Sequence, residues 1–179
     1  MLYAFGFERV GVLASDMYIV IPTPEPGQEG AERGVRLEVR LLERGDLAGS
    51  PYSARPIEVG RPVWRVDLLE AVDGPPGSLN RAHHHPAFHG WEPGKRVFDA
   101  SLTASPVQWV GEQLANLEGL LERAGVPADE ATAADAKALR DCLPEIMDAV
   151  GRLLQQSRDR ELAAPAGGEP VTGARVGWL

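Results

Sequence analysis

The sequence predicts an α+β fold in which a curved antiparallel sheet of about five or six strands packs against amphipathic C-terminal helices. Segments rich in β-branched and aromatic residues occupy residues 1–103, whereas helical periodicity is confined to residues 105–162. Because strands and helices are segregated along the chain, a doubly wound parallel sheet is excluded. We expect a single domain over residues 1–162 and a flexible C-terminal tail over residues 163–179.

Two segments show the alternation of a half-buried antiparallel strand. VRLEVRLLE at 35–43 and RPVWRVDLLEAV at 61–72 each place apolar side chains on one face and charged side chains on the other. Pairing of these strands would gather cross-strand charge partners on one face of the sheet. The predicted set is Arg36, Glu38, Arg40, Arg65 and Asp67.

Three further segments favour strands by composition: FGFERVGVLA at 5–14, MYIVI at 17–21 and KRVFDASL at 95–102. The stretch from Pro22 to Gly34 is rich in Pro, Gly and Glu, so it predicts a loop.

The C-terminal part predicts helices. Ser105, followed by Pro106 and Gln108, is typical of a capped helix start, and apolar residues recur at helical spacing to about Arg123. A second helical region runs from Asp129 to about Leu162. Pro144 removes a backbone donor within it, which predicts either a kink or two consecutive helices.

Charge and cysteine content narrow the function classes. The chain holds 18 basic and 26 acidic residues, a net charge of −8, which argues against a general nucleic-acid or membrane binder and gives no DNA-binding signature. The single cysteine, Cys142, excludes an intrachain disulfide and a cysteine-based zinc cluster. With neither a basic leader nor a membrane-spanning apolar run, we expect a cytoplasmic protein, and the Arg-, Ala- and Gly-rich composition suggests a bacterial source.

All four histidines lie in RAHHHPAFHGWEPGKRVF at 81–98. Pro86 biases His85 toward an extended conformation, and alternate residues of an extended segment project to the same side. His83 and His85 should therefore lie together and His84 opposite, while His89 follows a Pro-containing bend that would let it fold back toward the same side.

The first hypothesis for this cluster is a metal site. Three imidazoles suit Zn²⁺ or a similar divalent transition metal, and a carboxylate would complete the shell or act as a base. We predict the ligand set His83, His85, His89 and Asp99, with Asp67 and Glu92 as alternative carboxylates. The same loop is less acidic than the rest of the chain, so a small anionic ligand is the other candidate.

The second hypothesis is metal-free hydrolysis. Imidazole serves as acid or base near neutral pH, so His83 and His85, supported by Asp67, would act on a phosphodiester while Arg81 or Arg96 stabilises its negative charge.

A third hypothesis is a non-catalytic assembly partner, for example a homodimer through the sheet edge or the second helical region. The histidines would then be surface residues of a loop. Phosphate-loop, dinucleotide-binding, nucleophile-elbow and His-Glu-x-x-His motifs are absent from the sequence.

The block RPVWRVDLLEAVDGPPGSLNRAHHHPAFHGWEPGKRVF, together with the helix after it, resembles a family of uncharacterised actinobacterial proteins with an HHHPxFHGWEPG-type motif. The layout of residues 34–123, with strands, an HHHP loop, one more strand and a helix, is also similar to TumE-type toxins of toxin–antitoxin modules. Those small α+β proteins are thought to act on RNA. The second resemblance implies a ribonuclease with RNA as its partner, and it maps onto His83, His84 and His85 only.

Overall fold

The computed structural model describes residues 1–24, 26, 29–45, 57–127, 129–131 and 133–159. It has a five-stranded antiparallel sheet in which the strands follow one another in sequence order. The strands are β1 (Leu2–Gly6), β2 (Val10–Val20), β3 (Ala31–Arg44), β4 (Ile57–Ala71) and β5 (His83–His85). The predicted α+β class and antiparallel sheet are confirmed. The predicted tail of residues 163–179 lies outside the described residues.

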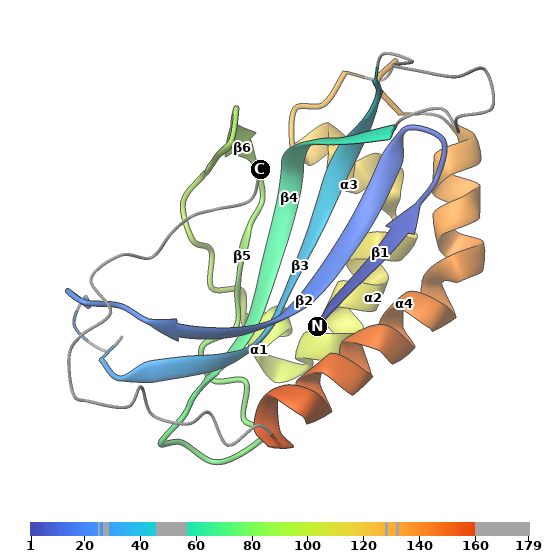
Figure 1. Ribbon diagram of the computed structural model, residues 1–179. Helices are drawn as coiled ribbons and strands as arrows, with labels where there is room; N and C mark the ends of the chain where they lie inside the picture. The colour runs from blue at the N-terminus through green and yellow to red at the C-terminus, as the bar shows by residue number, and fades with distance from the viewer. Residues whose placement is uncertain (25, 27–28, 46–56, 128, 132, 160–179) are drawn as a thin grey trace.

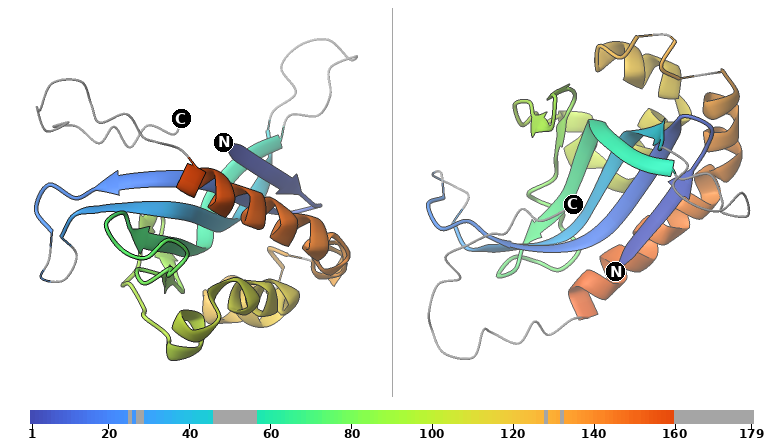
Figure 2. Two further views of the ribbon diagram at one scale, coloured as in Figure 1. Left: turned by 90° about the horizontal axis from the view of Figure 1, so that it is seen from below. Right: turned by 45° about the horizontal axis from the view of Figure 1, so that its top comes forward.

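The helices pack against one side of this curved sheet (Figures 1 and 2). They are α1 (Ala100–Ala104), α2 (Pro106–Ala115), α3 (Leu117–Arg123) and α4 (Ala133–Asp159). A two-stranded hairpin of β6 (Phe88–His89) and β7 (Glu92–Pro93) follows β5 at the edge of the sheet opposite β1. Within the described part of the chain, no helix combines the length and the apolar character needed to cross a membrane.

The hydrophobic core lies between the sheet and the helices. The apolar face of β2, β3 and β4 supplies one half of this core, and α2, α3 and α4 supply the other. Alternation leaves Arg36, Glu38, Arg65 and Asp67 on the sheet face away from the helices. The fully buried residues include Val12, Leu37, Val66, Leu68, Leu102, Leu114, Ile146 and Leu153.

The chain turns helical earlier than the sequence predicts. KRVFDASL was expected to be a strand to residue 102, but α1 begins at Ala100 because the Asp99 carboxylate accepts hydrogen bonds from the backbone N–H groups of Ser101 and Leu102. Val97 alone bridges back to β5, by pairing with His84. The strand prediction is therefore wrong beyond this point, since a local cap outweighed the β-favouring side chains.

The predicted helix 105–123 is two helices. Asn116 ends α2, and its side chain accepts a hydrogen bond from Gly119 N at the start of α3. Ser105 is the N-cap residue before Pro106, as predicted, but its side chain makes no capping hydrogen bond. The backbone N–H of Ser105 instead continues the preceding turn by donating to Ser101 O.

Pro144 bends α4 without breaking it. The helix is continuous over 27 residues with this proline inside it. Figures 1 and 2 both show its axis changing direction along its length, so that the helix follows the curvature of the sheet. Of the two predicted outcomes, a kink and two consecutive helices, the structure has the kink.

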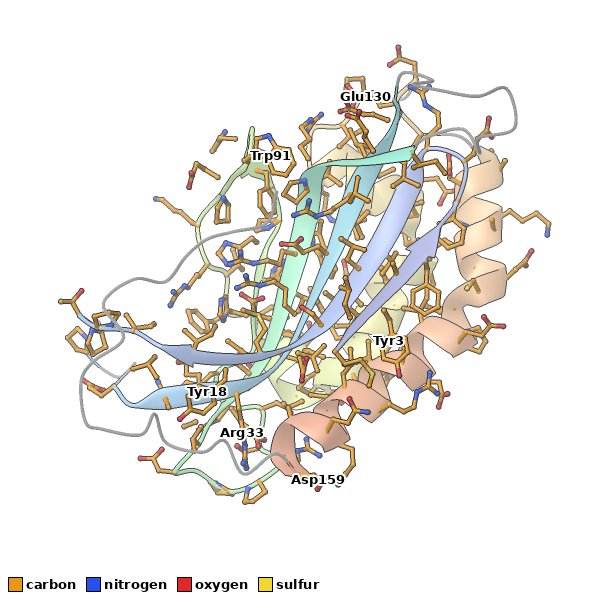
Figure 3. The ribbon with its side chains drawn as sticks, viewed as in Figure 1. Tyr3, Tyr18, Arg33, Trp91, Glu130 and Asp159 are labelled. Carbon is orange, nitrogen blue, oxygen red and sulfur yellow. The ribbon has the colours of Figure 1, made fainter. Side chains whose placement is uncertain are left out.

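A buried carboxylate holds the loop that leads into β5. Glu70 accepts hydrogen bonds from Arg33 Nε at 3.1 Å and from the backbone N–H of Gly77 at 2.6 Å. Arg158, near the C-terminal end of α4, lies 3.8 Å from the same carboxylate, and Figure 3 shows Arg33 at this end of the sheet. These contacts fix the residues that enter β5, and with them the histidines.

Close packing of β3 on β4 requires a glycine at position 34. Gly34 has a φ of +152°, and a Cβ there would lie 2.0 Å from the carbonyl oxygen of Leu68. We expect Gly34→Ala to lower the free energy of unfolding by about 3–5 kcal/mol, because the clash is with backbone. Chemical denaturation measures this change.

Gly151→Ala is the matched control, because a Cβ at this position in α4 meets nothing within 4 Å. It should raise stability by about 0.5–1 kcal/mol, since alanine is the better helix former. Equal effects of the two substitutions would contradict the packing described for Gly34.

Candidate metal and anion site

The β3–β4–β5 register builds two cross-strand rows on the face away from the helices. Arg36 pairs with Asp67, which pairs with His83. In the next row Glu38 pairs with Arg65, which pairs with His85. The predicted sharing of one face by the charged residues of β3 and β4 is confirmed.

The three residues of β5 separate the histidines as predicted. His83 and His85 join the polar rows, while His84 points to the helix side, where its ring lies 4.9 Å from that of Trp109 and 6.5 Å from that of Trp64. Both tryptophans are core residues, with 7% and 3% exposure. His84 therefore belongs to the packing between sheet and helices.

The chain after the hairpin returns along the free side of β5. His84 and Val97 exchange both backbone hydrogen bonds, at 3.0 and 2.9 Å. Continuing this antiparallel register by one residue in each direction sets Arg96 opposite His85 and Phe98 opposite His83. The rings of His83 and Phe98 lie 5.5 Å apart, in agreement with that register.

Asp67, His83 and His85 form a compact group with metal-ligand chemistry. One ligand atom from each lies within 4.8 Å of the other two, close enough to hold a metal ion. The three residues are 1%, 4% and 3% exposed. This burial sets the group apart from the acidic clusters that occur on protein surfaces without binding an ion.

Hydrogen bonds to backbone carbonyls orient both imidazoles. His83 Nδ1 donates to the carbonyl of Arg81 at 2.9 Å, and His85 Nδ1 donates to the carbonyl of Gly94 at 2.7 Å. A carbonyl only accepts, so each Nδ1 carries a proton, and both Nε2 atoms point toward Asp67 and its cations. Protein metal sites commonly orient a ligating histidine by such a bond from its second ring nitrogen.

Two arginines neutralise the buried carboxylate. Arg36 donates from Nε to Asp67 Oδ1 at 2.7 Å and from Nη2 to Oδ2 at 3.2 Å. Arg65 Nη2 lies 3.1 Å from Oδ2 of the same residue. Burial alone would raise the pKa of the Asp67 carboxyl, but His83, Arg36 and Arg65 together hold that pKa well below its usual range.

Arg65 also contacts the second histidine. Its Nη2 donates to His85 Nε2 at 2.8 Å, which is possible because the proton of His85 is on Nδ1. Burial lowers the pKa of His85 to about 4, although its bond to the Gly94 carbonyl acts in the opposite direction. His85 is therefore a neutral imidazole at pH 7. Burial likewise lowers the pKa of the Arg65 guanidinium, against the attraction of Asp67.

The other predicted site residues lie elsewhere. His89 is exposed in β6, where it pairs with Glu92 across the hairpin. Asp99 caps α1 with its carboxylate, and its charge acts on His84 rather than on the buried group. Of the predicted ligands His83, His85, His89 and Asp99, the structure brings only the first two together. Asp67 supplies the carboxylate.

Two members of the site were not predicted as such. Arg36 and Arg65 were expected only as charge partners on the polar face, yet they make the direct contacts to Asp67. The signal in the sequence is the alternation of charges in 35–43 and 61–72, which becomes specific once the register pairs Arg36 with Asp67.

Comparison with known proteins adds no further assignment, because no family model, curated protein or solved structure matches the chain.

The lowered pKa of His85 predicts how stability depends on pH. An unfolded histidine takes up a proton near pH 6.5, whereas folded His85 does so only near pH 4. The unfolded state thus binds more protons in this window, so stability falls as the pH drops from 6.5 to about 4. The contribution of this site is at most about 1.4 kcal/mol per pH unit.

Urea denaturation at several pH values measures this slope. His85→Asn, whose amide nitrogen can replace Nδ1 as the donor to Gly94, should flatten it. His89→Asn should leave it unchanged, because His89 is exposed in the hairpin. A slope identical in wild type and His85→Asn would contradict the neutral, buried imidazole.

Proposed function

We propose that the protein binds a divalent transition metal ion, such as Zn²⁺, through Nε2 of His83, Nε2 of His85 and a carboxylate oxygen of Asp67. One distance supports this proposal above all: His83 Nε2 lies 3.4 Å from Asp67 Oδ2. That is longer than a usual N–H···O hydrogen bond of about 2.7–3.2 Å. Two ligand atoms that each lie about 2.0–2.1 Å from a tetrahedral ion are about 3.3–3.4 Å apart, which matches it.

The donor set indicates which ions fit. Two imidazole nitrogens and one carboxylate oxygen suit Zn²⁺, Fe²⁺, Co²⁺ or Ni²⁺ better than the hard ions Ca²⁺ and Mg²⁺. Three protein ligands leave a coordination position for water or a substrate, as in catalytic rather than structural zinc sites. The bonds from Nδ1 to the Arg81 and Gly94 carbonyls hold the rings in place for this role.

Metal analysis tests the site directly. Wild-type protein should take up one equivalent of Zn²⁺ or Co²⁺, and its melting temperature should rise with metal concentration, because an ion that binds only the folded state stabilises it. His83→Ala and His85→Ala should each weaken binding at least about 100-fold, since each loses a ligand.

His89→Ala is the matched control for the metal titration, because this histidine stands apart from the buried group. Elemental analysis, calorimetry and thermal melts before and after chelation give the readouts. Failure of the wild-type protein to bind any of these ions, in sulfate buffer as well as in nitrate buffer, would sink the proposal.

A second candidate function is metal-free cleavage of phosphodiesters, the activity implied by the similarity to TumE-type toxins. The observation that favours it is a neutral proton acceptor, His85, placed beside the His83–Asp67 pair and near the positive charges of Arg36 and Arg65. An acid–base pair with cations beside it is the arrangement that such a reaction needs.

The two functions differ in their response to chelation. A metal-free enzyme would cleave RNA or bis(p-nitrophenyl) phosphate equally well in EDTA, and His85→Ala would abolish the activity, whereas His89→Ala would retain it. Growth arrest on overexpression, relieved by His85→Ala, would support the same activity in cells. Absence of cleavage with and without metal, together with harmless overexpression, would remove this candidate.

A further inference from the structure

Arg65 competes directly with a metal ion for His85. Its Nη2 donates to His85 Nε2 at 2.8 Å. Because Nδ1 of this ring donates to the Gly94 carbonyl, Nε2 has a single lone pair, and that lone pair faces the guanidinium. A metal ion needs the same lone pair. Arg65 and a metal ion therefore cannot both bind Nε2 of His85.

Arg65 also shares the carboxylate ligand. Its Nη2 lies 3.1 Å from Asp67 Oδ2, the same oxygen that faces His83. One guanidinium nitrogen of Arg65 thus contacts two of the three candidate ligand atoms. Arg36 holds the carboxylate independently, so Asp67 keeps a partner when Arg65 moves away.

Displaced Arg65 needs a new counter-charge. Its side chain is only 13% exposed, and its Nε is already buried without a hydrogen-bond partner in the described part of the chain. A divalent ion would add two positive charges beside Arg36 and Arg65. Of the two carboxylates nearby, Asp67 would bind the ion, and Glu38 already accepts a hydrogen bond from Arg40 at 2.8 Å. A charge left unpaired at such a site is strongly unfavourable. An anion that accepts hydrogen bonds from Arg65 removes this penalty.

We propose that Arg65 acts as an exchangeable internal cation that blocks metal binding. An oxyanion of the sulfate or phosphate type, by accepting hydrogen bonds from the Arg65 guanidinium, would draw it away and open the site to a metal ion. The inference rests on the proposed metal site and adds a second ligand to it. Metal and oxyanion then bind cooperatively, and each raises the affinity of the other by the same factor. The oxyanion would bind next to the metal ion, at the coordination position that the three protein ligands leave open.

Co²⁺ titrations test the proposal, because the visible spectrum of Co²⁺ reports its coordination. Wild-type protein should bind Co²⁺ at least about 10-fold more tightly in sodium sulfate than in sodium nitrate at the same ionic strength, a factor within the usual range of coupling between sites. Arg65→Met should bind Co²⁺ as tightly in nitrate as the wild type does in sulfate, and sulfate should no longer help.

Arg61→Met is the matched control, since Arg61 lies on the same strand but pairs with Glu130. It should keep the sulfate dependence of the wild type. If Arg65→Met does not fold, Arg65→Gln, which keeps a neutral donor, should show the same loss of sulfate dependence.

The outcomes separate this inference from the proposed function. Binding of Co²⁺ that depends on His83 and His85 but is the same in nitrate, in sulfate and in Arg65→Met would overturn the role of Arg65 and leave the metal site standing. If neither wild type nor Arg65→Met binds Co²⁺ in either salt, the metal site itself is wrong, and the coupling with it.

Discussion

Burying the carboxylate of Asp67 costs several kcal/mol unless cations accompany it into the fold. Arg36 and Arg65 provide those cations from the two adjacent strands β3 and β4, and His83 approaches from β5. The positions of the two arginines and the charge of the site both follow from this one requirement. Removing either arginine alone would leave a buried charge only partly compensated.

The register between β3 and β4 is what makes this compensation possible. It pairs Arg36 with Asp67 and Glu38 with Arg65, while the intervening residues Leu37 and Val66 meet in the core. A slip of one residue would turn the charged residues toward the helices and the core residues away from them. The same register therefore determines both the hydrophobic core and the polar site, so that a change in one would disrupt the other.

Local patterns in the sequence predicted the two central strands of the sheet and part of the site. Alternation in 35–43 and 61–72 predicted the polar face, and Pro86 predicted that His83 and His85 lie on one side. The choice among Asp67, Glu92 and Asp99 as the carboxylate was beyond sequence reasoning, because it depends on which strand lies next to β5. Asp99 also showed how a helix cap competes with strand propensity, since its carboxylate is used by α1.

The length of β5 has a consequence for how the site is assembled. This strand has three residues and pairs with β4 through only those three positions. The interior strands β2, β3 and β4 share far longer ladders. Local opening of β5 would therefore separate both imidazoles from Asp67 while Arg36 and Arg65, on the longer strands, stay paired with the carboxylate.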